Sequence, residues 1–310
     1  RVLWQSISAL QRRYSFIRCV VYTGYEADSK PAQILKKVKE RFGIDIYNEI
    51  EFVYLYRRGW VEAGRWPRFT ILGQSLGSLI LGLEALLKFS PNVFIDTTGY
   101  AFVVPLFKWL GSCKTVSYVH YPTVSQDMLD KVKQNEPSYG SSGERKSNFW
   151  VNLKLIYYRL YAKIYGFVGR RNDVVMVNST WTHGHISRIW GPKNLYIVYP
   201  PCDTTTFQQL PIARDSGKFV VVSVGQFRPE KDHSLQLTIF DQFLKHLDER
   251  DRKRAKLVLI GSCRNQEDKE RVIELRAAVK YLKISEHVQF KINVSYDKLI
   301  RELGSSTVAI

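Results

Sequence analysis

Apolar residues along the chain fall into two alternating patterns, which predict strands and helices in turn. Short runs that are apolar at almost every position, and rich in β-branched residues, are typical of strands covered on both faces of a sheet. Such runs occupy 16–22, 51–55, 92–96, 114–120, 173–178, 194–198, 218–224, 256–260, 287–291 and 307–310.

Between these runs, apolar residues recur at helical spacing. The predicted helices occupy 1–13, 32–42, 69–89, 153–168, 180–190, 234–247 and 267–281. Strands that alternate with helices form parallel sheets with helices on both faces. The pattern therefore predicts an α/β fold built of doubly wound parallel sheets.

The series of strands is interrupted at Tyr199-Pro200-Pro201-Cys202-Asp203. Adjacent prolines stiffen the chain and end both helices and strands, so we place a domain boundary here, between 1–200 and 201–310. The second domain is too short for a complete doubly wound unit, and the chain ends within a predicted strand. Residues 134–146 are rich in Pro, Gly and Ser and are predicted to form a mobile surface loop.

The chain has 310 residues, of which 45% are hydrophobic and 24% are charged, as in ordinary globular proteins. Its net charge of +17 predicts a partner that carries phosphate: nucleic acid, an anionic membrane or a phosphorylated small substrate. The cations are scattered rather than gathered in a recognition motif, which disfavours nucleic acid. The cysteines have neither disulfide nor metal-ligand spacing, which predicts reduced thiols in a cytosolic setting.

Two predicted helices bear on membrane association. The helix at 69–89 has about the ~20 residues needed to cross a bilayer, but Gln74, Glu84 and Lys88 interrupt it, which favours a buried or interfacial helix. At 153–171, aromatic rings alternate with cations, which suits a lipid headgroup layer and equally a helix whose tyrosines pack in a core. The aromatic residues are Tyr157, Tyr158, Tyr161, Tyr165 and Phe167, and the cations are Lys154, Arg159, Lys163, Arg170 and Arg171. We therefore expect the protein to associate with a membrane surface.

The strongest candidate for a binding loop follows the strand at 218–224. The strand ends at Gly225, the loop presents Arg228 and Lys231, and a helix begins near Asp232. Ligands of parallel sheets bind beyond the carboxyl ends of the strands, where glycine lets the backbone approach a phosphate. Both cations can bind phosphate oxygens, although a solvated turn has the same composition. The glycine spacing matches neither a Walker loop nor a dinucleotide-binding loop.

Polar residues also follow strands of the first domain. His120 ends one strand and can donate a hydrogen bond to a sugar hydroxyl or an anion, although lone histidines are more often structural. Asp96 and Ser179 follow two other strands, and Ser179 can also cap the next helix. His183 and His185 lack the spacing of a metal pair.

No Asp-x-Asp triplet occurs anywhere in the chain. A diphosphate leaving group needs positive charge, supplied either by a divalent metal held by carboxylates or by fixed cations. Arg228 and Lys231 offer the second solution. We therefore expect that glycosyl transfer by this protein would need no metal.

The sequence resembles the retaining GT-B glycosyltransferases of family 4, and most closely the α-1,2-mannosyltransferases of asparagine-linked glycosylation. The resemblance is carried by segments 94–100, 118–123, 177–182, 198–203 and 223–231. It implies a GT-B fold of two Rossmann-like domains, the first lacking its first strand and the second incomplete. It also implies transfer of mannose from GDP-mannose to a dolichol-diphosphate-linked oligosaccharide, without metal, at the cytosolic face of the endoplasmic reticulum membrane.

The resemblance assigns roles to the candidate residues. The donor diphosphate would be bound by Arg228, Lys231, Gly225 and Gln226, and His120 would be catalytic, contacting the donor sugar or assisting its transfer. The nucleoside would lie near Gly261, Ser262, Ile292 and Asn293. We place the acceptor side in the first domain, at Asp96, Tyr100, Tyr121 and Ser179. The implied partners are GDP-mannose, the dolichol-linked oligosaccharide, an anionic membrane surface and other mannosyltransferases of the pathway, with no nucleic acid.

Two departures from the family pattern concern the ends of the chain. Members open with a strand and a glycine-rich loop, whereas this chain begins in the following helix, so we expect the natural N-terminus and any anchor to lie outside this sequence. Members also carry Glu-x7-Glu in the second domain, and this chain ends before it. We therefore expect the 310-residue chain alone to be a poor catalyst or inactive. The alternative is a non-catalytic sugar-nucleotide-binding or scaffold protein.

Overall fold

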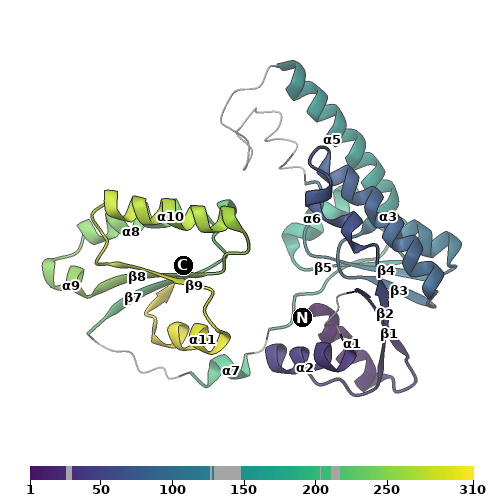
Figure 1. Cartoon of the computed structure of the whole chain (residues 1–310), viewed down its shortest axis with the longest axis horizontal. Coiled ribbons are helices and arrows are strands. Elements are labelled where there is room, and N and C mark those ends of the chain that lie inside the picture. Colours follow the sequence, from purple (N-terminus) through teal and green to yellow (C-terminus); the bar gives the residue numbers. More distant parts are fainter. Residues whose placement is uncertain (26–29, 126–127, 129–147, 203, 211–216) are drawn as a thin grey trace. The chain divides into compact units, whose positions relative to one another are not determined.

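The computed structural model describes residues 1–25, 30–125, 128, 148–202, 204–210 and 217–310 (Figure 1). The chain divides into two compact units, Arg1–Cys202 and Asp203–Ile310. The division falls in the same proline-containing stretch as the predicted boundary. The loop predicted at 134–146 lies outside the described residues. The four cysteines are free.

The strands of unit 1 are parallel and form two sheets. β1 (Cys19–Gly24) pairs with β2 (Ile50–Leu55). The second sheet has the order β3-β4-β5-β6, with β3 at Val93–Asp96, β4 at Lys114–Val119, β5 at Val174–Val177 and β6 at Leu195–Ile197. Among the described residues, β1 and β3 line one cavity and exchange no hydrogen bonds, so the parallel strands of this unit fall into two sheets.

Helices α1 (Val2–Arg13) and α2 (Pro31–Phe42) pack on the two-stranded sheet through an apolar cluster that includes Ile7, Leu35 and Val21. Helices α5 (Asn148–Gly169) and α6 (Thr180–Ile189) pack on β4 and β5. Tyr161 and Tyr165 of α5 are buried in that second cluster, together with Trp190. Of the two interpretations of this helix, the one with tyrosines in a core is therefore correct for these two residues.

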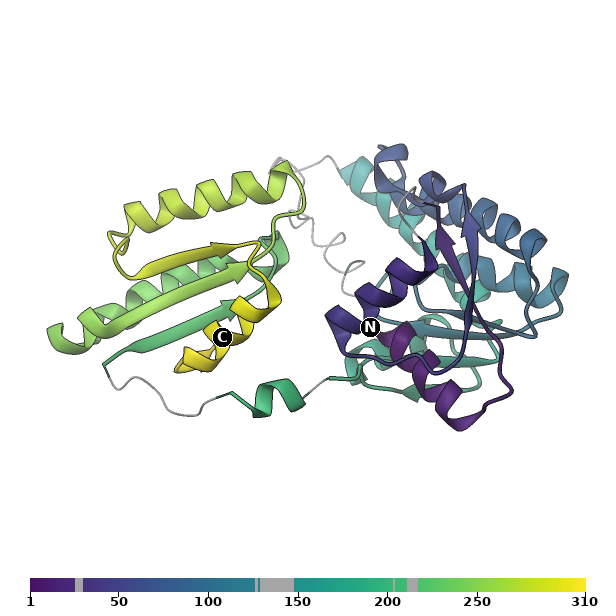
Figure 2. The ribbon, with the colours of Figure 1, turned by 60° about the horizontal axis from the view of Figure 1, so that its bottom comes forward.

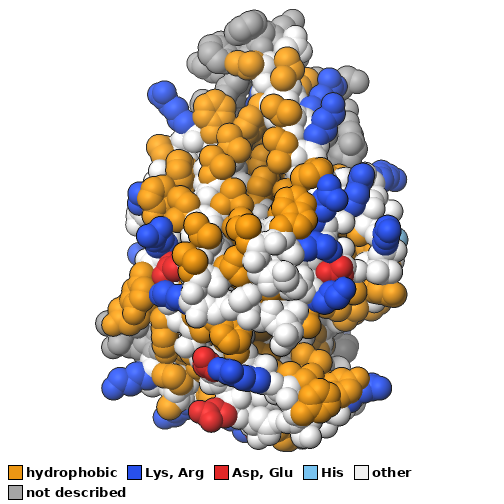
Figure 3. All heavy atoms as spheres, turned by 90° about the vertical axis from the view of Figure 1, so that its right-hand side faces the viewer, with side chains coloured by type: hydrophobic (Ala, Val, Ile, Leu, Met, Phe, Trp, Pro, Cys, Tyr) orange, Lys and Arg blue, Asp and Glu red, His pale blue; other side chains and the backbone are white. Residues whose placement is uncertain are grey.

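Helix α3 (Thr70–Lys88) follows two short 3-10 helices, η1 (Arg58–Val61) and η2 (Ala63–Arg65). It is the one helix among the described residues that is long and apolar enough to cross a membrane. Its buried face is lined by small residues, and a Cβ at Gly77 would lie 2.0 Å from the carbonyl oxygen of Trp60. The small residues thus serve close packing inside unit 1. The outer faces of α3 and α5 expose large apolar side chains (Figure 3).

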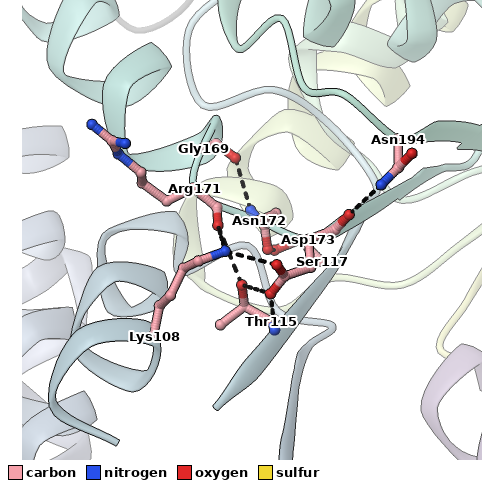
Figure 4. A network of polar contacts seen from close by, with 8 residues as sticks. All are labelled: Lys108, Thr115, Ser117, Gly169, Arg171, Asn172, Asp173 and Asn194. Carbon is pink, nitrogen blue, oxygen red and sulfur yellow. Dashed lines mark hydrogen bonds and ion pairs between the residues drawn. The ribbon is translucent and has the colours of Figure 1, made fainter. Parts of the chain in front are cut away.

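The 3-10 helix η3 (Ala101–Val103) and the π-helix η4 (Leu106–Leu110) connect β3 to β4, and η4 carries one end of a polar network at the amino ends of β4 and β5 (Figure 4). Lys108 Nζ donates to the carbonyl oxygen of Arg171 and pairs with Asp173 Oδ1, each at 2.8 Å. Asp173 Oδ2 accepts the N–H of Thr115 at 2.8 Å, and the carbonyl of Asp173 accepts from Asn194 at 2.9 Å. Burial alone would raise the pKa of Asp173, but the bonds from Lys108 and Thr115 together lower it. The network ties the end of α5 to the sheet.

Unit 2 contains one parallel sheet of order β10-β7-β8-β9. The strands are β7 (Phe219–Val224), β8 (Ala255–Gly261), β9 (Val288–Ile292) and β10 (Val308–Ala309). Helices α8 (His233–Lys245) and α10 (Gln266–Tyr281) cover one face, and α11 (Tyr296–Ser305) covers the other (Figure 2). The sequence did not predict α11, nor the short helices α7 (Thr205–Gln208), η5 (Pro229–Lys231) and α9 (Glu249–Arg254).

Candidate active site

The loops after β7 and β8 meet at the carboxyl edge of the unit 2 sheet. Gly225 N–H donates to the carbonyl of Ile260 at 2.9 Å, and Phe227 N–H donates to that of Ser262 at 3.4 Å. A Cβ at Gly261 would lie 2.0 Å from the carbonyl oxygen of Gly225, which no side chain could tolerate. The two glycines therefore give this edge a floor made of backbone, to which a ligand can come close.

The loop after β9 joins the same edge. Asn293 N–H donates to the carbonyl of Gly261 at 2.9 Å, and its Oδ1 accepts the N–H of Cys263 at 3.0 Å. Asn293 has a positive φ of 53°, which asparagine tolerates better than most residues. Ile292 pairs in register with Gly261 at the end of β9. The structure thus brings together the loops that carry two predicted sets of residues. The resemblance assigned the first set to the donor diphosphate and the second to the nucleoside: Gly225 and Gln226, and Gly261, Ser262, Ile292 and Asn293.

The two predicted phosphate ligands lie in the loop between β7 and α8. Cγ and Cδ of Lys231 lie 3.4 Å from the position of a Cβ on Gly225, so the lysine side chain runs over the end of β7. The Arg228 guanidinium is paired with Glu230 at 3.0 Å. Both residues precede the amino end of α8, where Asp232 accepts the N–H of Leu235 at 3.2 Å. Two cations, a glycine floor and a helix amino end together suit a phosphate-bearing ligand.

His233 lies behind this loop and was not predicted. Its ring is buried and lies 5.0 Å from that of Phe227, which is fully buried. Burial lowers the pKa of His233, and the neighbouring charges of Lys231 and Arg271 lower it further, so the ring is neutral at physiological pH. Nothing in the sequence around His233 indicated that this side chain would be buried.

His120, the predicted catalytic residue, is exposed just beyond β4 in unit 1. Its ring lies edge-on to that of Tyr118, with centroids 4.9 Å apart. Tyr118 is buried, and its hydroxyl donates to the carbonyl of Val198 at 2.8 Å. The exposed imidazole thus packs against a buried, hydrogen-bonded tyrosine while it remains accessible to a ligand.

Two of the predicted acceptor residues lie beside His120, at the carboxyl ends of β4 and β5. Tyr121 is exposed and stacks on Trp181, with ring centroids 5.0 Å apart. Ser179 is the N-cap of α6, and its Oγ accepts the N–H of Thr182 at 3.1 Å. The capping role considered from the sequence is thus present, and it engages the Ser179 hydroxyl.

The other two, Asp96 and Tyr100, line the cavity between β1 and β3, which has a volume of about 380 Å³. Asp96 Oδ1 accepts the N–H and hydroxyl of Thr98 and the N–H of Gly99, at 2.8 to 3.1 Å. Burial raises the pKa of Asp96, against the opposing effect of these hydrogen bonds. Arg58 also lines the cavity, and sequence reasoning missed it because η1 is distant from these residues in sequence.

Within the described ranges, no three His, Cys, Asp or Glu side chains lie close enough together to hold a metal ion. Charged side chains near the unit 2 edge include Arg228, Glu230, Lys231 and Asp232, and the Arg264–Asp268 pair follows β8. That the chemistry needs no metal stays a prediction.

Comparison with solved structures shows the fold. A trehalose-6-phosphate phosphatase N-terminal domain from Candida albicans is similar with a TM-score of 0.62 and 12% identity, over 99% of this chain and 72% of that one. An alpha,alpha-trehalose-phosphate synthase (UDP-forming) from Burkholderia vietnamiensis gives a TM-score of 0.60 and 13% identity, over 94% and 76%. The fold is that of the GT-B glycosyltransferases, as predicted.

Comparison of sequences shows the family. Residues 205–310 match glycosyl transferases group 1, and residues 1–190 match the ALG11 mannosyltransferase N-terminus. Proteins named GDP-Man:Man(3)GlcNAc(2)-PP-Dol alpha-1,2-mannosyltransferase are 46% identical in Xenopus laevis and in Homo sapiens, over all of this chain. The chain spans 64% of the length of each of these relatives. By the match over most of its length, the chain belongs to the ALG11 mannosyltransferase family.

Proposed function

We propose that this protein is an α-1,2-mannosyltransferase that transfers mannose from GDP-mannose to a dolichol-diphosphate-linked oligosaccharide. The relatives that share 46% of its residues carry that activity in their names. The structural observation that carries the proposal is the edge of unit 2, where Lys231 runs over Gly225 beside Gly261. A nucleoside diphosphate offers the phosphate oxygens that such an edge can bind.

The proposed reaction breaks the bond between the anomeric carbon of mannose and the diphosphate oxygen. GDP leaves with the bonding electron pair, the acceptor hydroxyl forms the new bond on the same face of the sugar, and its proton passes to the departing diphosphate. Charge builds up on the diphosphate as it departs, and the Lys231 ammonium and the Arg228 guanidinium stabilise it. Arg228 is paired with Glu230 in the free protein, so donor binding exchanges a carboxylate partner for a phosphate.

His120 has the role of hydrogen-bonding to the transferred sugar in this proposal. Its exposed ring and its contact with Tyr118 support the assignment, because the imidazole is accessible and restricted in orientation. Asp96, Tyr100 and Tyr121 are assigned to the acceptor. No metal takes part. The reaction takes place at the cytosolic face of the endoplasmic reticulum membrane, where the dolichol-linked acceptor is embedded.

Transfer of labelled mannose from GDP-mannose to a lipid-linked Man3GlcNAc2 acceptor tests the proposal. The 310-residue chain and a longer form extended to the full length of the relatives are assayed side by side, each with and without EDTA. We expect the longer form to transfer mannose at the same rate in both conditions. Loss of transfer in EDTA would contradict the metal-independent mechanism, and absence of transfer together with absence of GDP-mannose binding would contradict the proposed function.

A further inference from the structure

The loop after β8 carries an arginine to which neither the sequence pattern nor the resemblance assigned a role. Arg264 lies three residues beyond Gly261, the last residue of β8, and its side chain is 46% exposed. The same loop includes Cys263, whose N–H donates to Asn293 Oδ1 at 3.0 Å. Since β8 pairs with β7 on one side and β9 on the other, Arg264 lies at the carboxyl edge of the sheet, in the middle one of three loops.

A buried carboxylate holds the Arg264 side chain. Asp268, the third residue of α10, is 4% exposed, and its Oδ2 accepts the Arg264 backbone N–H at 2.9 Å and Arg264 Nε at 3.2 Å. Asn265 caps the same helix by accepting the N–H of Asp268 at 3.0 Å. The two bonds to backbone N–H groups serve to cap α10. The bond to Nε has no part in capping, and it fixes the guanidinium.

The partner of Arg264 differs from that of Arg228. Hydrogen bonds from the backbone N–H and then the side chain of Arg264, together with the charge of Arg228, lower the pKa of Asp268 against the effect of burial, so the carboxylate is ionised. Its side chain is 6% exposed, whereas Glu230, the partner of Arg228, is 49% exposed. Arg228 can therefore exchange its partner for a phosphate, while Arg264 keeps Asp268 and presents directed N–H groups with little net charge.

The Arg264 guanidinium suits a pair of neighbouring neutral acceptors. The bond through Nε leaves the N–H groups of both terminal nitrogens for a ligand, in a planar fork. Guanine presents two acceptors, O6 and N7, side by side on one edge, and a forked arginine is the commonest side chain that recognises them. Adenine presents one acceptor and one donor on the same edge, so the fork discriminates between the two purines.

We propose that Arg264 binds O6 and N7 of the donor's guanine base and thereby selects guanine nucleotides, with Asp268 as the residue that positions it. This inference rests on the proposed function for the choice of a guanosine diphosphate donor, and it adds the residue that recognises the base. A diphosphate at the end of β7, close to Gly225, brings its nucleoside to the neighbouring loops, because paired strands lie about 4.8 Å apart. Arg264 lies in the first of these loops.

Binding of GDP and of 7-deaza-GDP, in which a carbon replaces N7, tests the inference. Both are measured by isothermal titration calorimetry with the longer form used in the transfer assay. We expect the wild type to bind GDP about tenfold more tightly than 7-deaza-GDP, since one of two acceptors is lost. Arg264→Met should weaken GDP about 30-fold and 7-deaza-GDP about threefold, so that the preference disappears. Arg264→Lys keeps the charge without the fork and should retain a preference of about threefold at most.

Arg254→Met is the matched control. Arg254 is also paired with an aspartate, Asp251, at 3.1 Å, but it precedes β8 and therefore lies at the opposite end of the same strand. This variant should bind both nucleotides like the wild type. Lys231→Ala should weaken both equally and keep the tenfold preference, because it acts on the diphosphate. An Arg264→Met protein that keeps the preference would overturn the inference even if it bound GDP more weakly, since a purely structural role affects both nucleotides alike.

Asp268→Asn tests the positioning role. The amide keeps the size of the side chain but holds the guanidinium more weakly, so the preference for GDP should fall to about threefold. A full tenfold preference in this variant would exclude Asp268 from that role. In the transfer assay, Arg264→Met should raise the KM for GDP-mannose and leave kcat nearly unchanged, because the base is bound equally before and during transfer.

The same measurements separate this inference from the proposed function. A wild-type protein that binds GDP and 7-deaza-GDP equally, and still transfers mannose, would overturn the role of Arg264 alone. A wild-type protein that binds neither GDP nor GDP-mannose would contradict the proposed function, and the recognition of guanine with it.

Discussion

The carbonyl oxygen of Gly225 lies 2.0 Å from the position that a Cβ on Gly261 would take. The contact joins the last residue of β8 to the residue that follows β7, and backbone hydrogen bonds hold both, so neither can move away. Gly261→Ala should therefore destabilise unit 2 by about 3 kcal/mol, measured by urea unfolding. Gly184→Ala on α6, where nothing lies within 4 Å of the added Cβ, should be neutral or slightly stabilising. A Gly261→Ala protein as stable as the wild type would mean that the two loops are further apart.

Lys231→Ala should weaken GDP-mannose binding about 30-fold, because a charged hydrogen bond to phosphate contributes about 2 kcal/mol. Isothermal titration calorimetry with GDP-mannose and with GDP measures the effect, which should be equal for both ligands if Lys231 binds the diphosphate. Lys253→Ala on the exposed helix α9 is the control and should bind normally. A loss confined to GDP-mannose would move Lys231 from the diphosphate to the sugar.

His120→Ala should lower kcat about 100-fold or more and change the affinity for GDP little, as expected for a group that acts on the transferred sugar. Initial rates of mannose transfer by the longer form measure the effect. His246→Ala, an exposed histidine on the other unit, should be without effect. Unchanged kcat with a raised KM for the donor would make His120 a binding residue.

Asp173→Asn should destabilise unit 1 by about 1–2 kcal/mol at pH 7, since it removes the ion pair with Lys108 while keeping the size of the side chain. The pKa of Asp173 is lowered on folding, so the stability that it contributes is present above its unfolded value of about 4 and is lost as pH falls through the lower folded value. Urea unfolding at pH 7 and near pH 3 should show the difference between wild type and variant shrinking. A difference independent of pH would exclude the ionised carboxylate as its source.

The strands of both units could be predicted closely because runs that are apolar throughout have few other interpretations. The meeting of the loops after β7, β8 and β9 was also predictable, since parallel strands place their following loops together. Helix α9 was missed because its sequence, Glu-Arg-Asp-Arg-Lys-Arg, has no apolar face, and it is held by the cap of Asp248 on the Asp251 N–H.

Helix α5 shows what the pattern along the chain could not decide. Tyrosines and aliphatic residues lie on different sides of it, both sides are apolar, and spacing alone does not say which side faces the sheet. Only packing against Trp190 and Val175 decides that the tyrosines are buried. Arg58 and the approach of Gly261 to Gly225 depend on tertiary contacts in the same way.

The Lys108–Asp173–Thr115 network closes the amino ends of β4 and β5, whereas His120 and Ser179 follow their carboxyl ends. The two strands therefore carry a stabilising polar network at one end and the residues proposed to meet the sugar at the other, separated by the length of the strands. Substitutions in the polar network should lower the amount of folded protein, while the molecules that do fold keep their full activity. Substitutions of His120 should leave the amount of folded protein unchanged, whereas substitutions of Ser179 should also lower it, because they remove the cap of α6.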